Sequence, residues 1–103
     1  MKRIIVLYGP PKDAAAFDRQ YRERHVPLCL KMPRLKGFEV NRGPVAVSDV
    51  PGAYHCVAIL TYDSQEDLEF SLASPEGVAA VEDVANFATG GARIVTLESQ
   101  VYR

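Results

Sequence analysis

The segment from Ala53 to Tyr62, AYHCVAILTY, constrains the fold more than any other part of the chain. Its β-branched and aromatic residues predict a strand, in which successive side chains point to opposite faces of a sheet. We expect one face to carry Tyr54, Cys56, Ala58, Leu60 and Tyr62, and the other His55, Val57, Ile59 and Thr61. Both sets are largely apolar, so both faces of the sheet must be covered.

Similar patterns predict the remaining elements. Ile4 to Leu7 is a β-branched run ended by Gly9, Pro10 and Pro11, which is typical of a buried strand followed by a turn. Further strands are expected over residues 35–41 and 92–101, with a loop rich in proline and glycine over residues 42–52. Helices are expected from an N-cap at Asp13 to Met32, from Ser64 through Leu72, and from Ser74 to about Phe87.

This order of elements predicts an α+β, ferredoxin-like βαββαβ fold, with a four-stranded antiparallel sheet and the helices on one face. A chain of 103 residues has the size of one domain, which we expect to span residues 1–103. The second sheet face is then apolar and uncovered, which monomers rarely tolerate. We therefore expect a homodimer, packed sheet to sheet about a two-fold axis.

The charge balance and the motifs of the sequence argue against several classes of partner and cofactor. Twelve basic and thirteen acidic residues give a net charge of −1, so nothing favours a nucleic acid or a membrane as partner. The first apolar run is too short for a signal peptide or a membrane span. Neither cysteine, Cys29 or Cys56, has metal-ligand spacing, which predicts buried, reduced thiols in a cytoplasmic protein. No nucleotide, flavin or metal motif is present, so we expect no cofactor and no metal.

The most suggestive chemistry lies in FDRQYRERHVPLCLKMP, residues 17–33. Helical spacing places four of its residues on one face: Phe17, Tyr21, His25 and Leu28. Pro27 lacks an amide donor and crowds the preceding turn, so the helix should kink or weaken just past His25. His25 is either a core histidine that satisfies a freed carbonyl or a general acid–base group in a half-buried pocket.

A second candidate group lies in EDVANFATGG, near the end of the last predicted helix. Asp83 and Phe87 are four residues apart, so the carboxyl group would lie beside apolar side chains and would need a partner. The alternative is a solvated acid at a helix end. Tyr8, Tyr21, Tyr54 and Tyr62 either line a pocket with their hydroxyl groups or fill a small core.

Taken together, these blocks resemble the EthD family of the dimeric α+β barrel superfamily. The resemblance covers nearly the whole chain. It rests on Phe17 and Tyr21 ahead of His25-Val26-Pro27-Leu28, on Pro33 and Gly37, on Tyr54-His55, on Ser74-Pro75-Glu76-Gly77 and on Asp83 through Phe87.

The resemblance implies a homodimer that acts by proton transfer, without a cofactor, on a small hydrophobic cyclic or aromatic compound in catabolism or secondary metabolism. Isomerase, cyclase and monooxygenase activities all remain open. A non-catalytic ligand-binding or accessory protein of a degradation pathway is the alternative. Carried over, His25 is the leading proton-transfer residue, with Asp83 as its partner or as a pocket wall. The substrate-binding residues would be Tyr8, Phe17, Tyr21, Leu28, Tyr54 and Phe87.

Overall fold

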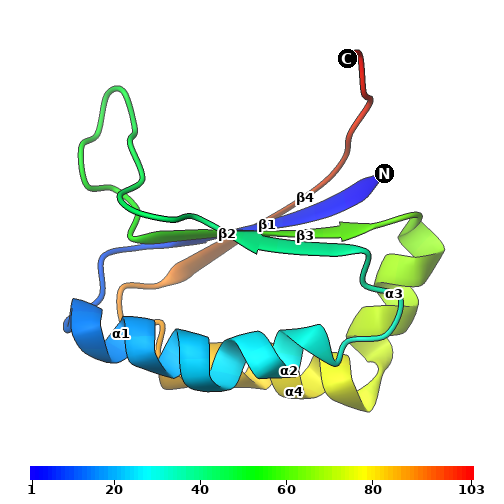
Figure 1. Ribbon diagram of the computed structural model, residues 1–103, viewed down its shortest axis with the longest axis horizontal. Coiled ribbons are helices and arrows are strands. Elements are labelled where there is room, and N and C mark those ends of the chain that lie inside the picture. The colour runs from blue at the N-terminus through cyan, green and yellow to red at the C-terminus, as the bar shows by residue number, and fades with distance from the viewer.

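A four-stranded antiparallel sheet lies over a layer of helices in the computed structural model, which describes residues 1–103 (Figure 1). The sheet order is β2-β3-β1-β4. The strands are β1 (Lys2–Tyr8), β2 (Gly37–Val40), β3 (Cys56–Tyr62) and β4 (Ala92–Glu98). Because β1 pairs with both β3 and β4, the first and last parts of the chain lie side by side in the sheet. The predicted α+β, ferredoxin-like fold is confirmed.

All helices lie on one face of the sheet (Figure 1). The first helical segment consists of α1 (Ala14–Gln20), a π-helical turn (Tyr21–His25) and α2 (Val26–Leu30). The second consists of α3 (Gln65–Ala73), α4 (Pro75–Asp83) and a 3-10 turn (Val84–Asn86). The two segments contact each other mainly through α2 and α4.

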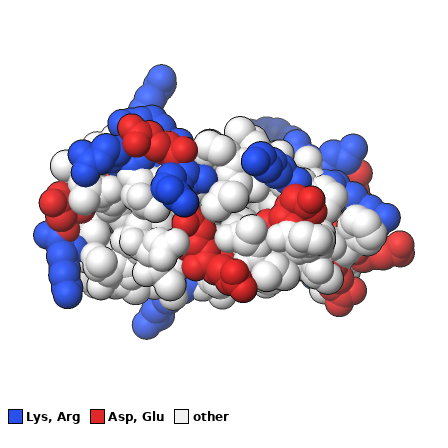
Figure 2. Space-filling view, turned by 90° about the horizontal axis from the view of Figure 1, so that it is seen from below, with Lys and Arg blue, Asp and Glu red and all other residues white.

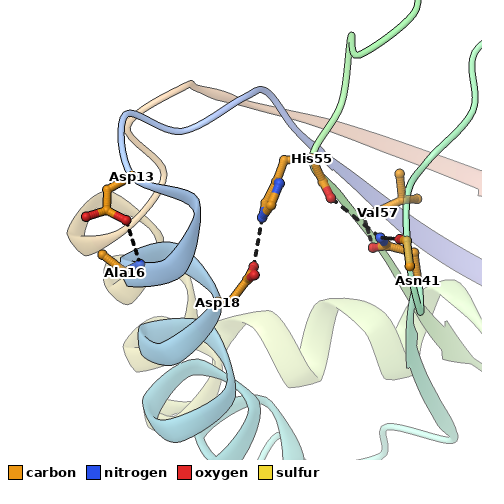
Figure 3. A network of polar contacts seen from close by, with 7 residues as sticks. Asp13, Ala16, Asp18, Asn41, His55 and Val57 are labelled. Atoms are coloured by element: carbon orange, nitrogen blue, oxygen red, sulfur yellow. Dashed lines mark hydrogen bonds and ion pairs between the residues drawn. The ribbon is translucent and has the colours of Figure 1, made fainter.

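The predicted N-caps are present at all three helix starts. The Asp13 carboxylate accepts a hydrogen bond from the amide of Ala16 at 3.0 Å (Figure 3). The Ser64 hydroxyl accepts from the amide of Asp67, and the Ser74 hydroxyl accepts from the amide of Gly77. Each cap pairs an amide that the first turn of a helix would otherwise leave free.

The irregularity in the first helical segment lies before Pro27, so the prediction of a kink just past His25 was wrong in position. The turn Tyr21–His25 is π-helical, and the amide of Val26 bonds the Tyr21 carbonyl. Since Pro27 has no amide and its ring crowds the preceding turn, that turn widens instead of breaking. The wider turn holds Tyr21 and His25 on the same buried face.

Three strand boundaries also differ from prediction. The strand predicted from Ala53 begins only at Cys56, the strand predicted over residues 35–41 covers Gly37–Val40, and the last strand ends at Glu98. A bend precedes Cys56, so His55 does not share a face with Val57; its side chain turns toward α1 (Figure 3).

The face of the sheet turned away from the helices has an apolar centre, and the same register places Arg3, Glu39 and Arg93 around it. Alternation places six aliphatic side chains there, which we call the free face: Ile5, Leu7, Val57, Ile59, Val95 and Leu97. The β2–β3 loop, the C-terminal segment and the N-terminal end of β1 rise on that side (Figure 1). Val95 and Leu97 are 41% and 36% exposed, so nothing within one subunit covers this face completely.

Replacing Gly77 by alanine should destabilise the fold. A Cβ atom at Gly77 would lie 2.0 Å from the Ser71 carbonyl oxygen, where α4 begins against the end of α3. Overpacking against backbone costs about 1–3 kcal/mol in unfolding free energy. Urea titration should detect this loss in Gly77→Ala. Gly37→Ala is the control, because its Cβ would meet Thr61 at an ordinary 3.5 Å. Equal stability of the two variants would contradict the packing described.

Candidate active site

A buried histidine–carboxylate pair joins the two helical segments. The Nδ1 atom of His25 lies 3.0 Å from Oδ2 of Asp83, and the two residues are only 4% and 5% exposed. The second carboxylate oxygen, Oδ1, accepts a hydrogen bond from the Asn86 side-chain amide at 3.0 Å. With both oxygens acting as acceptors, the imidazole carries its proton on Nδ1, and its Nε2 atom is the free base.

The Nε2 atom faces a thiol. Cys29 Sγ lies 3.4 Å from Nε2, one helical turn beyond His25. Burial raises the pKa of Cys29 to about 12, and the nearby charge of Asp83 adds to this effect. The thiol therefore keeps its proton and donates a hydrogen bond to Nε2. Burial also lowers the pKa of His25, against the opposing effect of the Asp83 hydrogen bond, so the ring stays neutral at neutral pH.

Aromatic rings surround the imidazole. The centroids of Phe87 and Tyr21 lie 4.8 and 5.0 Å from the centroid of the His25 ring. Tyr8 and Phe17 extend this cluster, with Tyr8 in contact with both Tyr21 and Phe87. The Tyr21 hydroxyl is buried and makes no well-formed hydrogen bond; its polar neighbours are the Tyr8 hydroxyl and the Cys56 thiol, which are close enough to affect its pKa. Burial raises the pKa of Tyr21 strongly, so its hydroxyl remains protonated.

A cavity of about 150 Å³ lies between the helices and the sheet, beside Nε2. Thirteen of its fifteen lining residues are hydrophobic, and none is Lys, Arg, Asp or Glu. Its inner residues are fully buried, among them Tyr8, Tyr21, His25 and Cys29. Val81 of α4 and Ile94 of β4 are 53% and 63% exposed, which places the mouth of the cavity between these two elements.

The structure brings most of the predicted site residues together, but not all of them. His25, Tyr8 and Tyr21 line the cavity, while Asp83, Phe17 and Phe87 surround them from behind. Leu28 packs at the margin of the core and does not line this cavity. Tyr54 lies in a separate depression with Leu7 and Arg93, because the chain bends before β3 begins. Leu28 and Tyr54 therefore lie apart from the site.

The sequence does not predict two polar contacts at or near the site. The first is that of Cys29, predicted as a buried core thiol, with His25; its spacing of four from His25 is the available signal. The other is that of His55, whose Nε2 lies 2.7 Å from Oδ1 of Asp18 on α1 (Figure 3). Nothing in the local sequence indicates that pair, because the two residues are 37 positions apart.

Asn41 fixes the end of the β2–β3 loop beside this pair (Figure 3). Its Oδ1 accepts from the amide of Val57 at 2.9 Å, and its Nδ2 donates to the Gly43 carbonyl at 2.8 Å. His55, Asp18 and Asn41 line a wider, more polar depression that also reaches Tyr21. Tyr21 therefore lies between that depression and the apolar cavity.

The outer surface gives little support to other functions. Figure 2 shows acidic and basic residues interspersed with neutral surface on the helical face, without a continuous basic area. No group of three or more His, Cys, Asp or Glu side chains is placed to hold a metal ion. No helix combines the length and the apolar character that crossing a membrane requires.

Comparison with known proteins identifies the family of the chain. The model of the EthD domain matches residues 9–91. The chain belongs to the EthD family. It is also 37% identical over 100 residues to an uncharacterized 11.0 kDa protein in the thcB-thcC intergenic region of Rhodococcus erythropolis, an alignment covering 97% of this chain and 96% of that protein.

Solved structures agree with this assignment. An EthD family protein from Bacillus halodurans C-125 superposes with a TM-score of 0.88 at 30% identity, over 97% of this chain and 99% of that one. A dimeric protein of ferredoxin-like fold from Bacteroides fragilis has a TM-score of 0.66 at 20% identity, over 95% of both chains. SnoaB, a cofactor-independent oxygenase from Streptomyces nogalater, has a TM-score of 0.68 at 13% identity, over 98% of this chain and 95% of that one. The last two similarities concern the fold alone.

The buried imidazole should make stability depend on pH. In the unfolded chain, histidine binds a proton near pH 6.5, whereas His25 in the folded protein does so at lower pH. Below about pH 6.5 the unfolded chain therefore binds more protons, and stability falls as pH falls, by at most about 1.4 kcal/mol per pH unit. Urea unfolding between about pH 8 and 5 measures the slope.

The control for this prediction is the second histidine. His25→Asn should flatten the slope just below pH 6.5, whereas His55→Gln should retain the contribution of the buried ring. A slope that is unchanged in His25→Asn would contradict the assignment of the pH dependence to His25.

Proposed function

We propose that this EthD family protein catalyses proton transfer, without a cofactor, on a small, uncharged, cyclic or aromatic compound. His25 acts as the general base through Nε2, and Asp83 positions its ring. The observation that carries the proposal is the Asp83–His25 pair, because its second ring nitrogen, Nε2, is an acceptor that contacts only the Cys29 thiol and lies at an apolar cavity. A histidine oriented by a carboxylate is the usual form of a general base in enzymes.

The volume and the lining of the cavity restrict the size and the charge of the ligand. Its volume of about 150 Å³ is close to that of protein cavities that accept one benzene ring. No lining residue carries a permanent charge, so a carboxylate or ammonium group would be buried without a partner. The Tyr21 hydroxyl, which makes no well-formed hydrogen bond, can donate one to a carbonyl oxygen. These features favour a neutral ring compound that bears a carbonyl group with an acidic C–H beside it.

Isomerisation, cyclisation and oxygenation can each begin with removal of such a proton. The likeness of fold to SnoaB, described as a cofactor-independent oxygenase, is compatible with this chemistry. The choice among the three reactions depends on the fate of the carbanion, which the base itself does not determine. A ligand-binding or accessory protein would use the same cavity without abstracting a proton.

We also propose that the protein is a homodimer packed through the free face. Ile5 lies directly opposite Ile59 and Val95, and the other three aliphatic side chains of the free face extend this apolar centre, which is typical of an interface. The structural neighbour from Bacteroides fragilis is described as dimeric. The helices do not cover this face, which leaves its centre open to a second copy (Figure 1).

Proton abstraction is testable without knowing the natural substrate. Phenylacetone has one aromatic ring, a carbonyl group and an acidic C–H between them. Incubated with the protein in deuterium oxide, it should lose its benzylic proton signals faster than with free imidazole at equal concentration, as measured by NMR. His25→Gln should reduce the excess rate by about 100-fold or more.

His55→Gln is the matched control for this exchange experiment, because that histidine lies outside the apolar cavity. The His55→Gln variant should exchange the benzylic protons of phenylacetone at the wild-type rate. An unchanged rate in His25→Gln would overturn the assignment of the base. Binding of phenylacetone without any exchange would favour the ligand-binding alternative.

The dimer is tested by a charge at the centre of the free face. Ile5 lies opposite both Ile59 and Val95, so Ile5→Asp should place a carboxylate in the proposed interface and give a monomer in analytical ultracentrifugation. Val78→Asp, on an exposed position of α4, should leave the dimer intact. A wild-type protein that sediments as a monomer would contradict the proposal.

A further inference from the structure

Cys29, His25 and Asp83 form a continuous polar chain at the inner end of the cavity. Cys29 Sγ lies 3.4 Å from Nε2, and Asp83 Oδ2 lies 3.0 Å from Nδ1, so each ring nitrogen has one partner. A nucleophile, a histidine and an orienting carboxylate in this order make up the constellation that activates weak nucleophiles in enzymes. The function proposed above assigns no role to the thiol.

A ligand inside the apolar cavity can reach the Cys29 sulfur. Although the side chain is shielded from bulk solvent, with 3% exposure, it lines the apolar cavity together with Tyr8, Tyr21 and His25. A small apolar molecule in the cavity would therefore contact both the sulfur and Nε2. Water and charged reagents, by contrast, have little access to the sulfur. The cavity thus selects among electrophiles by polarity and size.

The Tyr21 hydroxyl is a further feature of the cavity that favours a carbonyl-bearing ligand. It is buried, makes no well-formed hydrogen bond although the Tyr8 hydroxyl and the Cys56 thiol lie near it, and belongs to a residue that lines the same cavity. A buried donor without a partner is costly unless a ligand supplies an acceptor. An uncharged carbonyl oxygen is the acceptor that suits an apolar cavity, since it needs no counter-ion.

We propose that Cys29 adds reversibly to small, neutral, cyclic α,β-unsaturated carbonyl compounds. The thiol sulfur forms a bond to the β-carbon while His25 Nε2 accepts the thiol proton. The electron pair of the C=C bond moves toward the carbonyl oxygen, which accepts a hydrogen bond from the Tyr21 hydroxyl. His25 then returns the proton to the α-carbon. The net step adds S–H across C=C and requires no oxidant, reductant or leaving group.

The raised pKa of Cys29 is compatible with this order of events. A thiolate standing alone in the cavity would be poorly solvated, so the proton leaves only as the S–C bond forms. The developing negative charge then resides on the ligand oxygen beside Tyr21 rather than on sulfur. Serine nucleophiles, whose hydroxyl groups are weaker acids than a thiol, are activated by histidine in the same way.

Cys56 provides a matched internal control. It is also buried, at 5% exposure, and burial likewise raises its pKa to about 12. It differs in having no histidine at its sulfur and in lying outside the apolar cavity. A difference in reactivity between the two thiols therefore reports on the histidine and the cavity.

The experiment treats the folded full-length protein with cyclohexenone and identifies the products by intact mass and peptide mapping. One adduct should form on Cys29 at a rate at least about tenfold above that of Cys56, and His25→Gln should remove this preference. Since that variant can also lose stability, a second arm uses the wild type alone. Cyclohexanone, which lacks the C=C bond, should protect Cys29 from modification and leave Cys56 unaffected.

Equal labelling of the two thiols, or labelling of Cys56 first, would overturn the inference. So would failure of cyclohexanone to protect Cys29. The inference uses the same cavity as the proposed function but does not require C–H abstraction, and wild-type protein separates the two. Adduct formation without phenylacetone exchange would support the thiol role alone, and exchange without an adduct would refute it while leaving the general base intact.

Discussion

The hydrogen bond between His25 and Asp83 connects the two helical segments within the apolar layer beneath the sheet. Both side chains are almost completely buried, so neither can exchange its partner for water. Removing one of them would leave a buried polar atom of the other without its hydrogen bond, which typically costs about 1–3 kcal/mol. Correct packing of α4 against the first segment and correct orientation of the imidazole are therefore one structural requirement.

The consequence is a site with two unlike sides. On one side, Asp83 is fully engaged by His25 and by Asn86. On the other side, Nε2 faces the Cys29 thiol and an uncharged cavity, and the Tyr21 hydroxyl makes no well-formed hydrogen bond. An apolar cavity strengthens the few polar interactions made within it, because little solvent screens them. The geometry thus favours reactions in which charge develops on the ligand and is held by neutral hydrogen-bond donors.

The sheet connects this site to the proposed dimer. Neighbouring residues on β4 serve the two faces: Ile94 lies at the mouth of the cavity, and Val95 lies on the free face. β4 is an edge strand, and within one subunit all seven of its residues are exposed. A partner subunit on the free face would therefore hold in place the strand that borders the cavity mouth. In this way, assembly and ligand access share one element.

The sequence alone determined the order of elements, the N-caps at Asp13, Ser64 and Ser74, and the apolar character of both sheet faces, because these depend on local periodicity and hydrogen-bonding capacity. It also nominated His25 and Asp83, but their contact spans 58 residues and exists only after the helices pack. Tertiary structure alone decided that Cys29 faces Nε2, that the chain bends at His55 to meet Asp18, and that Tyr54 turns away from the site. Such directions depend on where one element meets another, and a one-residue bend before a strand reverses the face that a side chain occupies.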